Sequence, residues 1–347
     1  MDKPIRIGAI GCSTIFNKAH GDAMLRIPNV FHVAAVCDID IAKAELFKQK
    51  FHAEEVYTDY REMLAKAPID AVVITTPTVA HCAPTVDSLN AGFHTFCEKP
   101  MAMTIDECKK MIAAAKKNNR TLTLGFQSRY APAWLKIREL VKSGAIGDLM
   151  SCTMTQYWDS GAGLYKDWRT SPDVSGGGII ADSAVHWIDI MRIIMGEITS
   201  VSAAMIPAPD SPYKNVDDDA LVTFAFENGT IGLLRNSWRH RRGLNSSESF
   251  EIFGTKGSVV ADLRTPWENG GIQKVTHWTR ENGTTWEFSC PSTRFVNQML
   301  NFADFVTGKA TEDNSFDGLQ AMLVQQEIYR AAKERRWIDI KSMRDEI

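Results

Sequence analysis

The sequence predicts an α/β protein of two domains, a doubly wound parallel sheet followed by an α+β domain. Short apolar runs alternate with longer amphipathic segments from residue 4 to about residue 125, which is the pattern of βαβ units. Farther along, two apolar runs are separated only by Glu227-Asn228-Gly229, a hairpin turn signal. A chain of 347 residues is also too long for one ordinary core. We therefore place a domain boundary near residue 125, giving domains 1–125 and 126–347.

Short β-rich runs and amphipathic stretches define the elements of the first domain. Strands are predicted near residues 5–10, 31–37, 71–75, 93–97 and 121–124. Helices are predicted at residues 14–27, 40–50, 78–91 and 104–118. The last helix opens with Thr104-Ile105-Asp106-Glu107, a capping box that satisfies backbone donors of the first turn. This alternation predicts a Rossmann-type parallel sheet with helices on its faces.

The second domain has a different pattern. Residues 220–226 and 230–238 are predicted as strands of one hairpin, so neighbouring strands there are expected to be antiparallel. Residues 316–335 are rich in good helix formers and predict a late helix. We expect an α+β domain built on a large, mainly antiparallel open sheet.

Composition excludes several classes of protein. Thirty-nine basic residues against 42 acidic ones give a net charge of −3, which offers nothing to a nucleic acid. Seven scattered cysteines, an odd number, fit a reducing compartment. The N-terminus runs directly into a strand pattern, and no apolar run approaches the ~18 residues that a membrane span needs. We expect a cytoplasmic protein with no membrane or nucleic-acid partner.

The first strand ends in a glycine turn that could hold a dinucleotide. The spacing G-x-G-x-x-G/A falls on Gly11, Ser13 and Phe16, so only the first glycine is present. A pyrophosphate would lie at the following helix N-terminus, where backbone N–H groups and the helix dipole favour anions. Asp38 ends the second strand, where an acid can accept ribose hydroxyls and repel a 2′-phosphate. Its alternative is an N-cap for helix 40–50.

The next two strand ends carry further candidates. Thr75-Thr76-Pro77-Thr78 and His81 can line the same crevice, although a strand end followed by a helix cap explains them equally well. Glu98-Lys99-Pro100 follows the strand 93–97, where the proline restricts Lys99 to extended geometry and aims its side chain at the crevice. The alternative for this tripeptide is a polar turn.

A second array lies in the other half of the chain. Gly176-Gly177-Gly178 is typical of a flexible loop, and it leads into a helix with Asp182, His186 and Asp189 at i, i+4 and i+7, hence on one helical face. The alternative is an N-cap aspartate with a buried core histidine. We expect no metal site, since one histidine and two carboxylates lack a further nitrogen or sulfur ligand.

Two other segments allow weaker hypotheses. The stretch from Tyr157 to Arg169 combines aromatic and polar side chains that suit a sugar or cyclitol ring, although such loops also simply pack. Arg239-His240-Arg241-Arg242, with Arg235 nearby, could bind an anion, but a solvated sheet face or a subunit contact is the more common explanation.

These motifs together resemble the Gfo/Idh/MocA family of NAD(P)-dependent sugar and inositol oxidoreductases. The resemblance covers essentially the whole chain, and the Glu-Lys-Pro and Asp-x-x-x-His motifs are specific to the family. The matching residues are Gly11-Cys12-Ser13, His20, Glu98-Lys99-Pro100, Gly125–Tyr130, Trp168-Arg169, Gly176–Gly178, Asp182, His186, Asp217–Asp219 and Gly254–Ser258. The chain departs from the family pattern at Ser13 and Phe16, and at Ala184, where a glycine is common.

The resemblance implies NAD as cofactor and three overlapping sets of site residues. The catalytic set is Lys99, Asp182 and His186. The cofactor-binding set is Gly11, Cys12, Ser13, Thr14, Ile15, Asp38, Thr75, Thr76, Pro77, His81, Glu98, Lys99, Gln127 and Arg169. The substrate-binding set is Lys99, Arg129, Tyr157, Trp168, Asp182 and His186.

The chemistry of alcohol oxidation assigns roles to the catalytic set. Hydride leaves a secondary alcohol carbon, so the hydroxyl proton needs a base that works near neutral pH. His186 is expected to be that base, Asp182 to orient it or the substrate, and Lys99 to stabilise the developing oxyanion and position the nicotinamide. We expect an NAD-dependent dehydrogenase of a sugar, sugar derivative or inositol.

Three further expectations concern the whole protein. One alternative function is a redox-neutral enzyme of the same family that oxidises and re-reduces its sugar, and another is a catalytically silent nucleotide-binding sensor. NAD is expected to be preferred over NADP because of Asp38. The outer face of the second domain's sheet, with Trp238 exposed on it, is expected to form a homo-oligomer, a dimer or tetramer.

Overall fold

The fold consists of two compact units. The computed structural model describes residues 3–158, 168–206, 215–239, 246–263, 271–290, 293–310 and 313–345. The first unit comprises Met1–Gln127 and Ser292–Leu319, and the second Ser128–Pro291 and Gln320–Ile347. The segment 292–319, expected in the second domain, therefore belongs to the first unit, and the second unit is interrupted by it.

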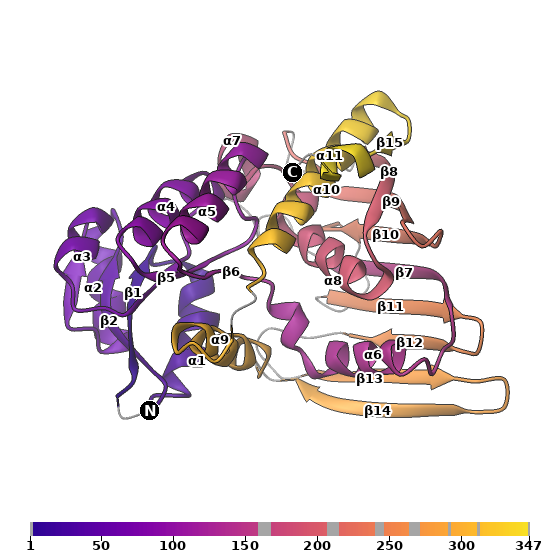
Figure 1. Ribbon diagram of the computed structural model, residues 1–347, viewed down its shortest axis with the longest axis horizontal. Helices are drawn as coiled ribbons and strands as arrows, with labels where there is room; N and C mark the ends of the chain where they lie inside the picture. Colours follow the sequence, from indigo (N-terminus) through magenta and orange to yellow (C-terminus); the bar gives the residue numbers. More distant parts are fainter. Residues whose placement is uncertain are drawn as a thin grey trace. The chain divides into compact units, whose positions relative to one another are not determined.

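The first unit is built on a six-stranded sheet in the order β3-β2-β1-β4-β5-β6 (Figure 1). Its strands are β1 (Ile5–Ile10), β2 (Phe31–Cys37), β3 (Glu55–Tyr57), β4 (Ala71–Ile74), β5 (His94–Cys97) and β6 (Leu122–Leu124). All five neighbouring pairs are parallel. The strand order reverses between β1 and β4, so this is the switch point at which doubly wound sheets bind ligands.

Helices connect these strands, and α2, α3 and α5 begin at side-chain caps. The helical segments are η1 (Phe16–His20), α1 (Gly21–Leu25), α2 (Ile41–Phe51), α3 (Tyr60–Lys66), η2 (Thr78–Ala80), α4 (Cys82–Asn90), α5 (Ile105–Lys117) and η3 (Gln127–Tyr130). Asp40 caps α2 and Asp59 caps α3. The capping box predicted for Thr104 and Glu107 is present at α5. Strand β3 and helix α3 were not predicted, because both are short and only partly buried.

Helix α9 (Thr293–Val306) completes the core of the first unit. Its buried side chains Phe295, Met299 and Phe302 recur at helical spacing and join one cluster with residues of β1, β2 and β5. The Phe302 ring stacks on Phe31 and meets Phe96 edge to face. A segment late in the sequence thus supplies part of the first core.

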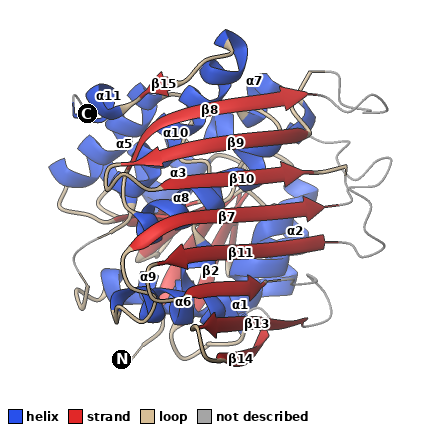
Figure 2. Ribbon diagram, turned by 90° about the vertical axis from the view of Figure 1, so that its right-hand side faces the viewer, coloured by secondary structure: helices blue, strands red, loops and turns tan. Residues whose placement is uncertain are grey.

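The second unit is built on a nine-stranded sheet in the order β14-β13-β12-β11-β7-β10-β9-β8-β15 (Figure 2). Its strands are β7 (Leu149–Trp158), β8 (Ile198–Ile206), β9 (Asp219–Phe226), β10 (Ile231–Ser237), β11 (Ser246–Gly254), β12 (Ser258–Asp262), β13 (Gly271–Trp278), β14 (Gly283–Cys290) and β15 (Ile338–Asp339). The β7–β10 pair is parallel and the other described pairs are antiparallel. The predicted fold class is confirmed.

Helices of the second unit lie on one face of this sheet. They are α6 (Pro132–Lys142), η4 (Trp168–Thr170), α7 (Pro172–Ser175), η5 (Ile180–Ala184), α8 (Val185–Met195), α10 (Ser315–Glu334, whose first turn belongs to the first unit) and α11 (Lys341–Asp345). Helix α8 packs on β7 and α6 on β13, and Figure 2 shows the other face of the sheet without a helix in front of it. Trp238 was expected on that bare face, but its side chain is buried, so that expectation is wrong. In the described part of the chain, no helix is long and apolar enough to cross a membrane.

Candidate active site

The glycine turn after β1 packs against the end of β4. Gly11 has φ of +92°, and a Cβ there would lie 2.8 Å from the backbone nitrogen of Thr76. The Thr75 hydroxyl donates to the Gly11 carbonyl oxygen at 2.7 Å. A side chain at residue 11 is therefore excluded, and the backbones at the switch point lie close together.

The helix after this turn begins at a serine cap. The Ser13 hydroxyl accepts from the Phe16 N–H at 3.2 Å, and helical residues begin at Thr14. Phe16 stands where the fingerprint has a small residue, and its ring meets Phe51 edge to face at 5.1 Å. Gly21 supplies the missing space, since a Cβ there would lie 2.5 Å from Phe51 and 2.8 Å from Phe16. The small residue that permits close packing is therefore Gly21, farther along the helix, and not residue 16.

Asp38 joins the end of β2 to the glycine turn. Its Oδ2 accepts from the Cys12 N–H at 2.8 Å and its Oδ1 from the Asp40 N–H at 2.9 Å. The cap of α2 is Asp40, which accepts from the Ala42 N–H at 3.0 Å, so the alternative of Asp38 as the cap is wrong. Burial raises the pKa of the Cys12 thiol to about 12, and the negative charge of Asp38 is the second cause of this rise. The thiol is therefore neutral.

His81 links the ends of β4 and β5. Its Nε2 lies 2.9 Å from the Thr76 carbonyl oxygen and its Nδ1 lies 2.8 Å from the Pro100 carbonyl oxygen. The ring is fully buried, which lowers its pKa although both carbonyl groups act in the opposite direction. Both ring nitrogens thus face protein carbonyl groups. His81 therefore connects the loop that carries Pro77 to the loop that carries Lys99.

Glu98 is a buried carboxylate beside Lys99. It lies 2.6 Å from Nε2 of His20 and accepts from the Lys99 N–H at 3.1 Å. Burial opposes its charge, yet His20, the Lys99 ammonium and the Lys99 N–H together keep the pKa of Glu98 below its ordinary value. Gly125 makes room for it, since a Cβ there would lie 2.5 Å from Oε1 of Glu98. The sequence did not indicate this packing.

The second unit places Asp182 and His186 on consecutive turns. Asp182 lies in the π-helical segment η5, and its N–H donates to the Gly178 carbonyl oxygen at 2.9 Å. Nε of Arg169 lies 3.7 Å from Oδ1 of Asp182. The His186 side chain is largely buried in the first turn of α8. The structure therefore groups Arg169, Asp182 and His186 within one unit.

Asp189, the third residue of the predicted stripe, has a different role. Its side chain is fully buried, and it accepts from Nε of Arg129 at 2.7 Å and also from Nη2 of that side chain. This bidentate pair ties η3 to α8. Gln127 and Arg129 lie in the same short turn, but Gln127 belongs to the first unit and Arg129 to the second.

The aromatic segment is only partly described. The Arg169 guanidinium lies over the Trp168 ring at 4.6 Å. Tyr157 pairs with Ser237 of β10, whereas Asn236, one residue earlier, reaches Ser183 of η5. Side chains alternate along a strand, so Tyr157 lies on the sheet face opposite η5 and is not brought to Asp182. Residues 159–167 lie outside the described part of the chain.

The arginines near the end of β10 form ion pairs within the second unit. Arg235 donates from Nη2 to Oδ2 of Asp219 at 3.0 Å. Nε of Arg239 lies 3.9 Å from Oδ2 of Asp218, and the Arg239 side chain is only 10% exposed, so it does not form a solvated face. The rest of the cluster, 240–242, lies outside the described residues.

Two family models match this chain. One is described as an oxidoreductase family with an NAD-binding Rossmann fold and matches residues 5–126. The other, the GFO/IDH/MocA C-terminal domain, matches residues 134–260. The chain belongs to the Gfo/Idh/MocA family. This family member is therefore an NAD-binding oxidoreductase.

Individual relatives of this Gfo/Idh/MocA protein are similar over most of its length. The uncharacterized oxidoreductase YrbE of Bacillus subtilis is 31% identical over 92% of both chains. Myo-inositol 2-dehydrogenase of Thermotoga maritima is 29% identical over 74% of this chain and 75% of its own. A solved structure of levoglucosan dehydrogenase, in complex with NADH and levoglucosan, superposes with a TM-score of 0.86 at 25% identity, covering 98% of this chain and all of that one.

The first unit of this family member fits NAD. Gly11 forms a cradle that a Cβ would fill, a capped helix begins directly after it, and the Asp38 carboxylate stands at the end of the neighbouring strand. Lys99 follows β5, which is separated from β1 by β4, and it lies at the same edge of the sheet. When bound, NAD would supply the hydride acceptor that no side chain can provide.

Proposed function

We propose that this protein is an NAD-dependent dehydrogenase that transfers a hydride between NAD and a secondary alcohol or ketone of a sugar, sugar derivative or inositol. The observation that carries the proposal is the crowded edge of the parallel sheet, where Gly11 packs on Thr76 and the buried Glu98 adjoins Lys99. The names of the relatives, which include levoglucosan and myo-inositol 2-dehydrogenases, support the substrate class.

Three side chains carry the chemistry in this proposal. His186 takes the proton of the substrate hydroxyl, and Asp182 orients the imidazole or the substrate. Arg169 lies beside Asp182, with its Nε 3.7 Å from Oδ1 of the carboxylate. The Lys99 ammonium stabilises negative charge on the substrate oxygen, and its placement after β5 suits contact with the nicotinamide as well. In the reverse direction the same groups reduce a ketone.

Other residues bind the two partners of the reaction. The remaining proposed cofactor contacts are Cys12, Ser13, Thr14, Ile15, Asp38, Thr75, Thr76, Pro77, His81, Glu98, Gln127 and Arg169. His81 acts in this scheme through the two carbonyl groups that it holds. Arg129 and Trp168 complete the proposed substrate contacts, with Arg129 held by Asp189. Tyr157 is also a proposed substrate contact, and its position on the face of β7 opposite η5 argues against that role.

A substrate panel tests the proposed function. Inositols, aldoses, sugar acids and glycosides are offered with NAD, and NADH formation is followed by its absorbance. At least one of them should give turnover. Consumption of the sugar without net NADH would instead indicate the redox-neutral enzyme, and NAD binding without any consumption would indicate a sensor.

Substitution of the proposed base tests the mechanism. His186→Ala should lower kcat by about 10²- to 10⁴-fold while NAD still binds, and Lys99→Ala should cost at least as much. For the wild type, kcat/KM for the alcohol should rise with pH as His186 loses its proton, then level off. That rise should vanish in His186→Ala and persist in His277→Ala, a control on β13. Near-full activity of His186→Ala with the rise intact would make His186 a core residue.

We also propose a homo-oligomer and a cytoplasmic location. On the bare face of the second sheet, large apolar side chains are exposed at alternate positions, and they include Leu221, Ile231, Phe253, Val260 and Ile272. Exposed apolar side chains gathered on one face of a sheet are typical of subunit interfaces. Six cysteines in the described part of the chain are free thiols, which suits a reducing compartment.

A further inference from the structure

A buried carboxylate, Asp217, holds the start of the segment that carries Asp182 and His186. Its Oδ1 accepts from the Gly178 N–H at 2.8 Å and its Oδ2 from the Ile180 N–H at 2.9 Å. The N–H between them, that of Ile179, donates to the Asp217 carbonyl oxygen at 2.8 Å. One residue thus satisfies three successive backbone donors that have no partner within the helix.

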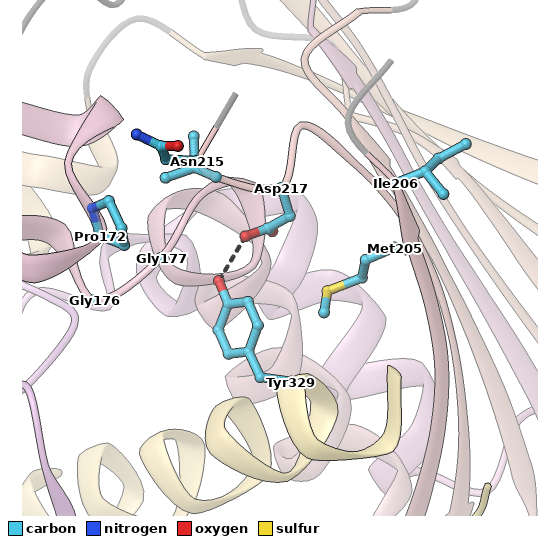
Figure 3. Close-up of a pocket in the computed structure, with 9 residues that line it drawn as sticks. Pro172, Gly176, Gly177, Met205, Ile206, Asn215, Asp217 and Tyr329 are labelled. Atoms are coloured by element: carbon cyan, nitrogen blue, oxygen red, sulfur yellow. Dashed lines mark hydrogen bonds between the residues drawn. The ribbon is translucent and has the colours of Figure 1, made fainter. Parts of the chain in front are cut away.

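Tyr329 of helix α10 fixes this carboxylate from the other side. Its hydroxyl donates to Oδ1 of Asp217 at 2.9 Å, and the dashed line in Figure 3 marks this bond. The Gly178 N–H also lies 3.2 Å from the Tyr329 oxygen. Burial, together with Asp217, raises the pKa of Tyr329 well above its ordinary value, so it remains a hydrogen-bond donor.

Gly177 and Gly178, two of the three glycines before Asp182, permit this arrangement. A Cβ on Gly177 would overlap the Tyr329 hydroxyl, and a Cβ on Gly178 would overlap the Asp217 carbonyl oxygen. Gly177 also has φ of +145°, which side chains rarely tolerate. The expected flexible loop is therefore a closely packed one, in which contact with Tyr329 and Asp217 requires glycine at positions 177 and 178.

A short path leads from this pair to the proposed catalytic groups. Gly178, held by Asp217 through its N–H, accepts from the Asp182 N–H through its carbonyl oxygen at 2.9 Å. His186 follows Asp182 by one helical turn. The positions of both residues therefore depend on the backbone hydrogen bonds that Asp217 accepts. Neither Asp217 nor Tyr329 has a role in the proposed proton transfer.

We infer that Asp217 and Tyr329 are a positioning pair, which sets the location of Asp182 and His186 for the reaction; this inference rests on the proposed function. The pair borders a cavity of about 440 Å³, with Met205 and Ile206 among its lining residues (Figure 3). Water can enter there when the tyrosine hydroxyl is removed. Tyr329→Phe is therefore expected to have a smaller effect than Asp217→Asn. The asparagine replaces one accepting oxygen by an NH₂ group, which would face a backbone N–H or the Tyr329 hydroxyl without forming the original bond.

The experiment compares these two variants with a matched control. Tyr60→Phe removes a similar tyrosine–aspartate bond, that of Tyr60 to Asp87 at 2.8 Å, in the first unit. Tyr329→Phe should lower kcat about 10-fold and Asp217→Asn about 100-fold, the scale of small misplacements of a reacting group. The KM for NAD should stay within about twofold in both, and Tyr60→Phe should leave kcat unchanged.

Hydrogen exchange of the segment 178–190 provides a readout that does not depend on turnover. Exchange there should be faster in Tyr329→Phe and Asp217→Asn than in the wild type, and unchanged in Tyr60→Phe. Unchanged exchange in both variants would overturn the inference. So would kcat values within twofold of the wild type, or a loss of kcat that follows only the loss of folded protein. A wild type without turnover on the panel would refute the proposed function alone, and exchange would still decide the role of the pair.

Discussion

Individual residues in this protein often matter through the space they leave. Gly125 admits the carboxylate of Glu98, Gly21 admits the rings of Phe16 and Phe51, and Gly178 admits the backbone of Asp217. A sequence marks such glycines but not their partners, and Gly178 and Asp217 are 39 residues apart. Their roles become clear only when the elements are assembled.

Asp38 and Asp40 offer a test with a built-in control. Asp38→Ala should remove the preference for NAD over NADP, because a carboxylate near the ribose disfavours a 2′-phosphate by charge repulsion. Asp40→Ala removes the cap of α2 and an exposed ion pair with Lys43, so it should lower the free energy of unfolding by about 1 kcal/mol and leave cofactor preference unchanged. The measurements are kcat/KM for both cofactors and urea unfolding.

The hydrogen bond from the Cys12 N–H makes the outcome for Asp38 more informative. Asp38→Asn keeps an oxygen that can accept from Cys12, so it preserves the turn while removing the charge. If Asp38→Asn and Asp38→Ala both leave the NAD to NADP ratio of the wild type, the carboxylate does not select the cofactor. Its role would then be confined to holding the glycine turn.

Local patterns indicate where single residues lie, but not which distant residues they contact. Lys99 and Asp38 stand at strand ends, where the position in the chain alone indicates the crevice. The His20–Glu98 contact joins residues 78 apart, and the Asp217–Tyr329 contact joins residues 112 apart. No spacing rule relates such partners, so neither contact was predicted.

At the scale of elements, periodicity located most of the first unit. The five predicted strands correspond to β1, β2, β4, β5 and β6 within a residue or two at each end. Periodicity could not reveal π-helical turns, because apolar spacing reports the period of a regular helix. Of the two described π segments, η5 carries Asp182 and η1 carries His20, which contacts Glu98, and π turns are frequent at such sites.

The second unit was predicted only in outline. One hairpin and two helices were located, whereas the order of nine strands depends on pairings between distant segments. The parallel β7–β10 pair joins residues about 80 apart, for example Ser151 and Ile231, and runs against the expected antiparallel rule. Helix α9 was also missed, although Phe295, Met299 and Phe302 recur at i, i+4 and i+7.

The ends of β5 and β6 supply a prediction about packing between elements. Gly125→Ala would place a methyl group 2.5 Å from Oε1 and 2.7 Å from Cδ of Glu98, so the carboxylate must move away from His20. We expect kcat to fall about 10-fold through displacement of Lys99. Overpacking should also lower the free energy of unfolding by about 1–3 kcal/mol.

A glycine in open space separates the two effects. Gly92 has φ of +91°, and a Cβ there would have no atom within 4 Å, so Gly92→Ala should cost stability through backbone strain alone. It should leave kcat unchanged. If Gly92→Ala and Gly125→Ala reduce kcat equally, loss of stability explains both, and Glu98 does not position Lys99.

At the scale of the whole molecule, the bare sheet face predicts self-association. Light scattering at micromolar concentration should give the mass of a dimer or tetramer of the 38.7 kDa chain. Charged substitutions at Ile231 and Ile272, both more than half exposed on that face, should shift the mass toward the monomer while the melting temperature stays close to that of the wild type. A monomeric wild type would contradict the proposed oligomer.

Helix α9 has a consequence for how the protein is made. Because Phe295, Met299 and Phe302 belong to the core around β1 and β5, the first unit is incomplete until residue 306 has been synthesised. A ribosome adds about 5–20 residues per second, and roughly 180 residues separate Gln127 from the end of α9. The strands of the first unit are therefore synthesised well before the helix that completes their core. A fragment ending at Gln127 would expose the apolar surface that α9 covers. The core of the first unit is therefore completed only after residues 128–291 of the second unit have been synthesised.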